Sequence, residues 1–314
     1  MRRALPLLLL VACAGSGGGG DAGPCPAILQ LAYSSDGRWL AAAHADGTVA
    51  VFELGGSAVR RLRVAGVAPR IALTEDGGLL AVAAEGKVLL WSAADGTVTR
   101  TLLTGTGPAV SVKMSDSPTP NLLVAFAGSA DNVRVWRVSD GILVGLAAGA
   151  PQATFTHADE AVLLLDEPGA TFEVVSFGAR VLRHVPLPAP LAHTAFAADG
   201  AYLGGVTGGG TDDERLAIMS VGDDTFTWQA AERTRQTRQL VFLENPSRIV
   251  QLAEHARLYD HGDGKVLMAL PALDRARLAV AAPDGSAVAA LVGAEIVFVS
   301  MTDGSTRPGP TACP

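Results

Sequence analysis

Two charged segments lie close together in the chain and could bind a ligand or a partner. Residues 207–214 are Gly-rich and end in three acidic side chains, while residues 232–238 are rich in arginine. The first segment lacks the Gly-Lys-Ser/Thr ending of a phosphate-binding loop and precedes a predicted strand, so we do not expect nucleotide binding. The candidate partner-binding residues are Asp212, Asp213, Glu214, Arg233, Arg235 and Arg238.

Signatures of metal binding and catalysis are weak. Residues 260–264 resemble half of a calcium loop, but the same Asp-Gly pair recurs along the chain, which favours a hairpin turn. The six His residues are scattered, whereas a metal site needs three or four converging ligands. No Gly-x-Ser-x-Gly motif and no catalytic Cys context occurs. The sequence therefore predicts no metal, no cofactor and no enzyme, although pairs of acid–base groups from distant segments stay open.

The composition indicates a folded, acidic protein. Apolar residues make up 49% of the 314 residues, charged residues 18% and aromatic residues 5%, so Ala, Val and Leu must build most of the core. The formal net charge is −7, which disfavours a nucleic-acid partner.

The N-terminus reads as an export signal. Arg2 and Arg3 precede a short apolar stretch that is too short to span a bilayer. Residues 10–13, Leu-Val-Ala-Cys, resemble the lipobox of bacterial lipoproteins, which implies a signal peptide over 1–12 and acylation of Cys13. Ala14 after the Cys implies the outer membrane, and the Gly-rich residues 13–24 are expected to form a tether. The alternative is an ordinary secretory signal cut near Ala14.

The remaining chain repeats one pattern seven times: apolar strand, turn, apolar strand, turn, strand with a bulky centre, Asp-Gly turn, strand. The bulky centres stand 39 to 45 residues apart, and a period in this range predicts a closed or stacked repeat architecture. Gly or Asp-Gly interrupts the chain too often for long helices. The expected units are 28–62, 67–102, 109–147, 151–188, 191–230, 237–271 and 274–310. Their bulky centres are Phe52, Trp91, Trp136, Val175, Met219, Tyr259 and Phe298.

Seven units of four short strands resemble a β-propeller of the WD-repeat kind. Trp91 and Trp136 stand where that family has its Trp-Asp dipeptide, but Ser92 and Arg137 replace the Asp. The resemblance implies an all-β fold over residues 25–314: a seven-bladed β-propeller of four-stranded antiparallel blades. The last unit ends in Ser-Thr-Arg-Pro-Gly-Pro, residues 305–310, and should make a poor fourth strand, because proline cannot donate to a ladder.

A propeller would place the two charged segments on one surface. Loops between blades, and loops from the second to the third strand of a blade, lie on one face, here called the top face. Both charged segments belong to such loops, in units five and six, so we expect them to lie near each other. They could neutralise one another as solvated charges, or they could form a docking patch for another protein.

Cys25 and Cys313 would lie at the two ends of the ring. In an oxidising compartment such thiols tend to pair, and a disulfide would close the ring where the last strand is poor. The chain-entropy description gives so long a loop roughly 4–5 kcal/mol of stabilisation. The alternative is two free thiols in frayed ends.

These expectations favour a binding protein. We expect a monomeric, lipid-anchored envelope scaffold that binds envelope proteins through its top face, touches the membrane only through its lipid, and faces the periplasm. The alternative is a ligand-binding or enzymatic propeller, similar to lactonases or quinoproteins, that uses its central channel. The predicted channel positions are Ile28, Arg70, Ser111, Ala153, His193, Gln239 and Ala276.

Overall fold

The computed structural model of the chain describes residues 26–311 with short gaps. The gaps are 67, 85, 94, 104–106, 116, 118, 128–131, 148–151, 156–160, 166–170, 178–179, 188, 198–199, 223–224, 231–232 and 244–246. The predicted signal peptide, the tether, Cys13, Cys25 and Cys313 lie outside the described residues.

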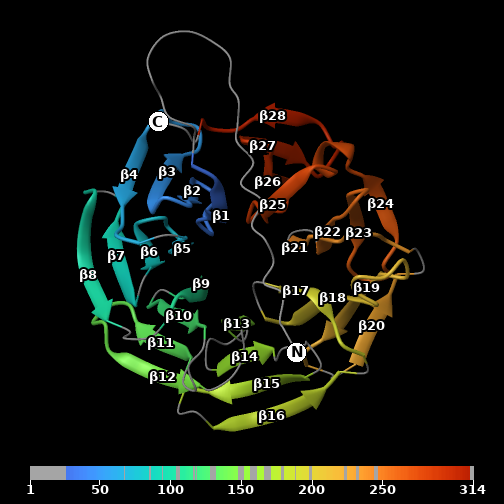
Figure 1. Cartoon of the computed structure of the whole chain (residues 1–314), viewed down its shortest axis with the longest axis horizontal. Helices are drawn as coiled ribbons and strands as arrows, with labels where there is room; N and C mark the ends of the chain where they lie inside the picture. Colours follow the sequence, from blue (N-terminus) through green and yellow to red (C-terminus); the bar gives the residue numbers. More distant parts are fainter. Residues whose placement is uncertain are drawn as a thin grey trace, which may run out of the picture.

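The described strands form seven four-stranded antiparallel sheets, each built from four strands that follow one another in the chain. Figure 1 shows these sheets standing around a ring, with the first strand of each sheet nearest the centre and the fourth at the perimeter. The predicted all-β propeller with four-stranded antiparallel blades is therefore confirmed, and each of the predicted repeat units supplies one sheet. We number the blades in chain order.

Blade one contains β1 (Ile28–Tyr33), β2 (Trp39–His44), β3 (Thr48–Glu53) and β4 (Val59–Arg63). Blade two contains β5 (Arg70–Leu73), β6 (Leu79–Ala84), β7 (Lys87–Ser92) and β8 (Thr97–Leu103). Blade three contains β9 (Ala109–Met114), β10 (Asn121–Phe126), β11 (Val133–Arg137) and β12 (Leu143–Ala147). Blade four contains β13 (Gln152–Phe155), β14 (Ala161–Leu165), β15 (Thr171–Ser176) and β16 (Val181–Pro186).

Blade five contains β17 (Ala192–Phe196), β18 (Tyr202–Thr207), β19 (Arg215–Ser220) and β20 (Thr225–Gln229). Blade six contains β21 (Gln239–Leu243), β22 (Arg248–Leu252), β23 (Arg257–Asp260) and β24 (Val266–Ala269). A short 3₁₀ turn, η1 (Pro271–Leu273), leads to blade seven, which contains β25 (Ala276–Ala281), β26 (Ala287–Val292), β27 (Glu295–Ser300) and β28 (Thr306–Pro308).

Asp-Gly turns fix the connections inside the blades. In the first turn, the Ser34 hydroxyl donates to the Asp36 carboxylate at 2.6 Å and accepts the Trp39 N–H at 3.0 Å. Blade two repeats this arrangement with Thr74 and Asp76. Gly follows each Asp because the backbone there is left-handed, with φ of +70° at Gly37 and +66° at Gly77. The Asp-Gly pairs are thus turn residues, as the sequence predicted.

Apolar packing between neighbouring blades holds the ring together. Each of the seven clusters of buried apolar side chains found among the described residues spans one seam between two blades. One of them joins Leu40 and Phe52 of blade one to Ile296 and Phe298 of blade seven, and so closes the ring. The last strand, β28, is only three residues long but pairs with β27, so the seventh blade is complete within the described chain.

Glutamine side chains form paired hydrogen bonds across two seams between blades. The Gln30 amide donates to the Ile71 carbonyl at 2.9 Å and accepts the Ile71 N–H at 3.0 Å. Gln239 does the same with Ala279, at 2.9 Å for both bonds. The predicted channel residue Gln239 therefore uses its amide to tie blade six to blade seven, by pairing with the edge of the neighbouring innermost strand at the buried Ala279.

Candidate functional site

The two charged segments meet on the top face, between blades five and six. We call this surface the blade-five/six site, made of the β18–β19 loop (208–214) and the β20–β21 connection (233–238). A backbone hydrogen bond from the Thr234 N–H to the Glu214 carbonyl, at 2.8 Å, joins the two segments. The prediction that they lie near each other is confirmed.

Glu214 holds the site together from the inside. It is 2% exposed, and its carboxylate accepts the N–H of Gly210 at 3.0 Å and the N–H of Thr237 at 3.1 Å. Burial alone would raise the pKa of Glu214, but these N–H donors favour the charged form and leave the pKa below its usual range. One of the predicted partner-binding residues is thus a buried link between the two segments.

Two ion pairs cross the outside of the site. Arg233 Nε lies 2.7 Å from Asp213 Oδ1, and Arg235 Nε lies 3.4 Å from Asp212 Oδ1. All four side chains are at least 60% exposed, so each pair contributes about 0–1 kcal/mol to stability. The two segments do neutralise one another in part, yet their charges remain available to solvent and to a partner.

Arg238 belongs to the interior of the ring more than to its surface. Its guanidinium donates to three backbone carbonyls, those of Ala253, Asp274 and Ala276, at 2.6 to 3.0 Å. These bonds tie the start of blade six to the start of blade seven. The arginine that the sequence grouped with the candidate partner-binding residues therefore supports the connections between blades.

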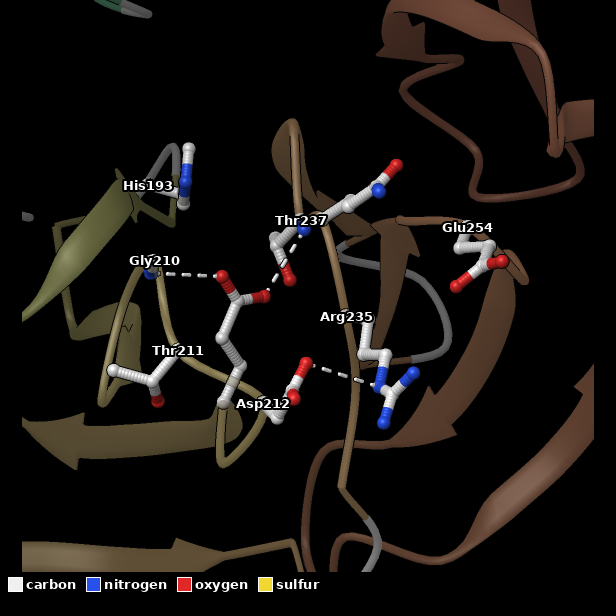
Figure 2. A pocket seen from close by; sticks show the side chains of 9 residues that line it. His193, Gly210, Thr211, Asp212, Arg235, Thr237 and Glu254 are labelled. Atoms are coloured by element: carbon white, nitrogen blue, oxygen red, sulfur yellow. Dashed lines mark hydrogen bonds and ion pairs between the residues drawn. The ribbon is translucent and has the colours of Figure 1, made fainter.

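An open pocket of about 660 Å³ lies beside the ion pairs. Figure 2 shows His193 and Glu254 on opposite sides of it, with the Asp212–Arg235 pair between them. Two residues that line it have left-handed backbones without being glycine: His193 with φ of +49° and Gln236 with φ of +53°. Such conformations are uncommon and often occur at functional sites.

A buried polar network beneath the site escaped the sequence analysis. The Gln251 amide group, fully buried, donates to the hydroxyls of Thr234 and Thr237 at 3.0 and 2.9 Å, and it accepts the Tyr259 hydroxyl at 3.0 Å. The available signal was a single glutamine among the buried apolar residues of the second strand, β22. A buried amide needs such partners, so the network fixes the connection that carries Arg233 and Arg235.

The predicted turn at residues 260–264 is a hairpin turn. The Asp260 carboxylate accepts the N–H groups of Gly262 and Asp263 at 2.7 and 3.3 Å, and Asp263 pairs with Lys265. Across the part of the chain that the structure describes, no three His, Cys, Asp or Glu side chains gather as metal ligands. Within that same part, no helix is both long and apolar enough to cross a bilayer.

Comparisons with known proteins agree with the fold. The sequence pattern of the family described as WD domain, G-beta repeat, matches residues 22–53, roughly a tenth of the chain. No curated protein matches the chain. The β-propeller domain of Cps50 (Swd1) from Myceliophteria thermophila is 14% identical, with a TM-score of 0.68 over 89% of this chain and 95% of that one. Hydrazine synthase from Kuenenia stuttgartiensis is 12% identical, with a TM-score of 0.68 over 96% of this chain and 99% of that one. At such identities the likeness concerns the fold alone.

Proposed function

We propose that this chain is a lipid-anchored β-propeller of the cell envelope that binds other proteins through the blade-five/six site. Propellers of the WD-repeat kind generally serve as scaffolds for protein interaction. The observation that supports the proposal most is the construction of the site: a buried Glu214 locks two loops together while four charged side chains stay exposed. A rigid frame with exposed charges favours a specific partner, because little side-chain and loop order is lost on binding.

Charge reversal at the exposed pairs tests this proposal. A double variant, Arg233→Glu with Arg235→Glu, places like charges opposite Asp212 and Asp213. A fourfold variant that also carries Asp212→Arg and Asp213→Arg restores both ion pairs but reverses the surface pattern. We expect both variants to lose the proteins that the wild type captures from solubilised envelope. Unchanged capture by both variants would mean that the pairs only neutralise one another, and capture lost by the double variant alone would assign them a structural role.

The lipid anchor is proposed from the sequence, because Cys13 lies outside the described residues. A lipidated Cys13 followed by a Gly-rich tether would hold the propeller at the periplasmic face of the outer membrane without a membrane span. Labelling cells with a radioactive fatty acid should mark the wild type and not the Cys13→Ala variant. Labelling of both proteins, or of neither, would refute the anchor.

A disulfide between Cys25 and Cys313 remains part of the proposal. The described ends support it: Ile28 and Ile296 share one buried cluster, and the Gly309 N–H donates to the Ile296 carbonyl at 2.9 Å. Both ends of the described chain therefore come to the seam between blades one and seven. A thiol assay on the native, unreduced protein should find neither cysteine reactive, and reaction of both would refute the pairing.

A small-ligand function is the second candidate, and the pocket beside His193 is the observation that favours it. Its volume of about 660 Å³ falls within the usual range for sites that hold small molecules. Metal analysis of the purified protein separates the candidates, because stoichiometric calcium would favour a ligand-binding or enzymatic propeller over a scaffold.

A further inference from the structure

One arginine on the inner wall of the ring has no partner. Arg70 is the first residue of β5, the innermost strand of blade two, and it is half-buried. Its Nε atom is buried and has no hydrogen-bond acceptor. Within the described chain its guanidinium also makes no ion pair and no contact with an aromatic ring. A buried N–H of a cation without an acceptor is costly, so this group needs an explanation.

The other half-buried arginines of the described chain all have partners. Arg183 donates to the carbonyls of Val221 and Gly222 in the next blade, and Arg100 binds a turn of blade three in the same way. The remaining ones are engaged as well: Arg60, Arg134, Arg215, Arg238, Arg248 and Arg257. Among the described residues, a half-buried arginine without a partner is therefore peculiar to position 70.

Arg70 faces the seam between blades two and three. Side chains along a strand alternate between its two faces. Ile71 and Leu73 pack in the seam between blades one and two, whereas Ala72 packs with Val112 of β9 in the seam between blades two and three. Arg70 shares the face of Ala72. Since Figure 1 shows the innermost strands β5 and β9 side by side around the centre, Arg70 lies at the top, inner end of their seam.

The repeat explains why the chain leaves Arg70 without a partner. Gln30 and Arg70 stand at the same distance before the Asp of the first turn, Asp36 or Asp76, so they hold equivalent positions. Gln30 bonds both the carbonyl and the N–H of Ile71 on the next innermost strand, because an amide donates and accepts. A guanidinium only donates, so it cannot form this pair. An arginine at this position therefore offers N–H groups to an acceptor from outside the chain.

The chemistry of the missing acceptor is that of an oxyanion. A planar guanidinium matches carboxylate and phosphate groups, which accept two parallel N–H bonds. The seven innermost strands of the described structure contain no Asp and no Glu, and they contain four basic side chains: Arg70, Lys113, His193 and Arg277. In a chain whose net charge is −7, this wall around the axis attracts anions. A flat protein surface cannot cover a half-buried residue on an innermost strand, so a small molecule fits best.

We propose that Arg70 binds a small molecule with a carboxylate or phosphate group at the top, inner end of the seam between blades two and three. The oxyanion accepts the Nε–H and a terminal N–H of Arg70, and so neutralises the half-buried cation. Ala68, two residues earlier, has a left-handed backbone with φ of +55°, a conformation that often occurs at functional sites. This seam is separate from the blade-five/six site, so Arg70→Gln should leave capture of envelope proteins unchanged.

NMR of the Arg70 Nε–H group in the full chain tests the proposal. Inorganic phosphate and succinate are titrated separately at constant ionic strength, with sodium chloride as the reference salt. We expect a saturable shift of the Arg70 signal with at least one of the two anions. Saturation by phosphate alone would identify a phosphate-bearing ligand, and saturation by succinate alone would identify a carboxylate.

Melting temperatures of two variants provide the second measurement. Arg70→Gln carries the residue that blade one has at the equivalent position, so it should fold. The control is Arg63→Gln, which changes an exposed arginine at the end of the outermost strand β4. The anion that shifts the Arg70 signal should raise the melting temperature of the wild type and of Arg63→Gln alike. Its affinity for Arg70→Gln, fitted from the same measurement, should be about tenfold or more weaker.

Several results would overturn the proposal. These are no saturable shift of the Arg70 signal with either anion, a shift of the same size with chloride, and equal stabilisation of the wild type and Arg70→Gln. A signal that shifts only when solubilised envelope is added would identify an acidic segment of another protein as the occupant instead.

Discussion

Replacing Glu214 by alanine should loosen the blade-five/six site more than any change to its exposed charges. The substitution removes the acceptor of two N–H groups, those of Gly210 and Thr237. Gly210 is exposed, so water can satisfy its N–H, whereas Thr237 is 3% exposed and its N–H would stay buried without an acceptor. A buried donor left unpaired costs about 1–3 kcal/mol, and loss of the charge-assisted bonds adds to this. We therefore expect a local destabilisation of about 2–4 kcal/mol.

Hydrogen exchange at the Thr237 amide is the direct assay, because the effect is local to one connection of a large ring. A change of about 2.7 kcal/mol corresponds to a roughly hundredfold loss of protection. The matched control is Asp212→Asn in the same loop, where the lost carboxylate is 85% exposed and its ion pair is weak. Exchange at Thr237 that is the same in Glu214→Ala, Asp212→Asn and the wild type would refute the role of Glu214 as the link between the two segments.

Acid should act on the same link. The folded pKa of Glu214 lies below its usual value, so the carboxylate stabilises the fold above the unfolded pKa and loses this contribution as pH falls through the folded pKa. Protection of the Thr237 amide should therefore fall on acidification in the wild type. In Glu214→Ala it should change little with pH, and an equal fall in both proteins would contradict the assignment.

Three further predictions concern the ring. Gly77→Ala should lower the free energy of unfolding, measured by urea titration, by about 2–4 kcal/mol, because φ is +66° and a Cβ there would lie 2.1 Å from the Trp39 ring. The control is Gly55→Ala, where φ is +88° but the space around the residue is open, and it should lower that free energy by only about 1–2 kcal/mol. Gln239→Leu should lower the free energy of unfolding by about 1–3 kcal/mol, since it leaves the N–H and the carbonyl of Ala279 unpaired. An unchanged melting temperature would contradict the role of Gln239 in joining the two blades. The hydroxyl and N–H of Ser305 donate to Asp303 and lower the pKa of its carboxyl from 3.8 to about 2. The stabilisation by this carboxylate should therefore be complete above pH 3.8 and disappear as the pH falls toward 2. A pKa near 3.8 for Asp303, measured by NMR titration of its carboxyl carbon, would refute this.

The repeat could be predicted from the sequence because it depends on local chemistry. Asp-Gly turns, short strands and a regular bulky residue recur in each unit, and each is decided by a few neighbouring residues. The same pattern predicted that loops 208–214 and 233–238 would meet, since the topology of a propeller places them on one face. Trp91 and Trp136 supported the family resemblance even though the Asp of the family dipeptide is replaced.

The roles of individual side chains could not be predicted in the same way. Glu214 and Asp212 stand two residues apart in one acidic run, yet one is buried and the other is almost fully exposed. Gln239 was assigned to the channel, and Arg238 to a docking surface, but both bind backbone groups of the next blade. These partners lie nearly 40 residues away, and pairing across blades depends on the closed ring rather than on any local pattern.

Photo-crosslinking in living cells tests the central claim most directly. A photoreactive amino acid is placed at Asp212 on the top face and, as a matched exposed position on the opposite face, at Asp303. If the blade-five/six site binds an envelope protein, irradiation yields a discrete covalent adduct from position 212, and the Arg233→Glu, Arg235→Glu background abolishes it. An adduct from position 303 alone, or a position-212 adduct that survives the charge reversal, would contradict the account.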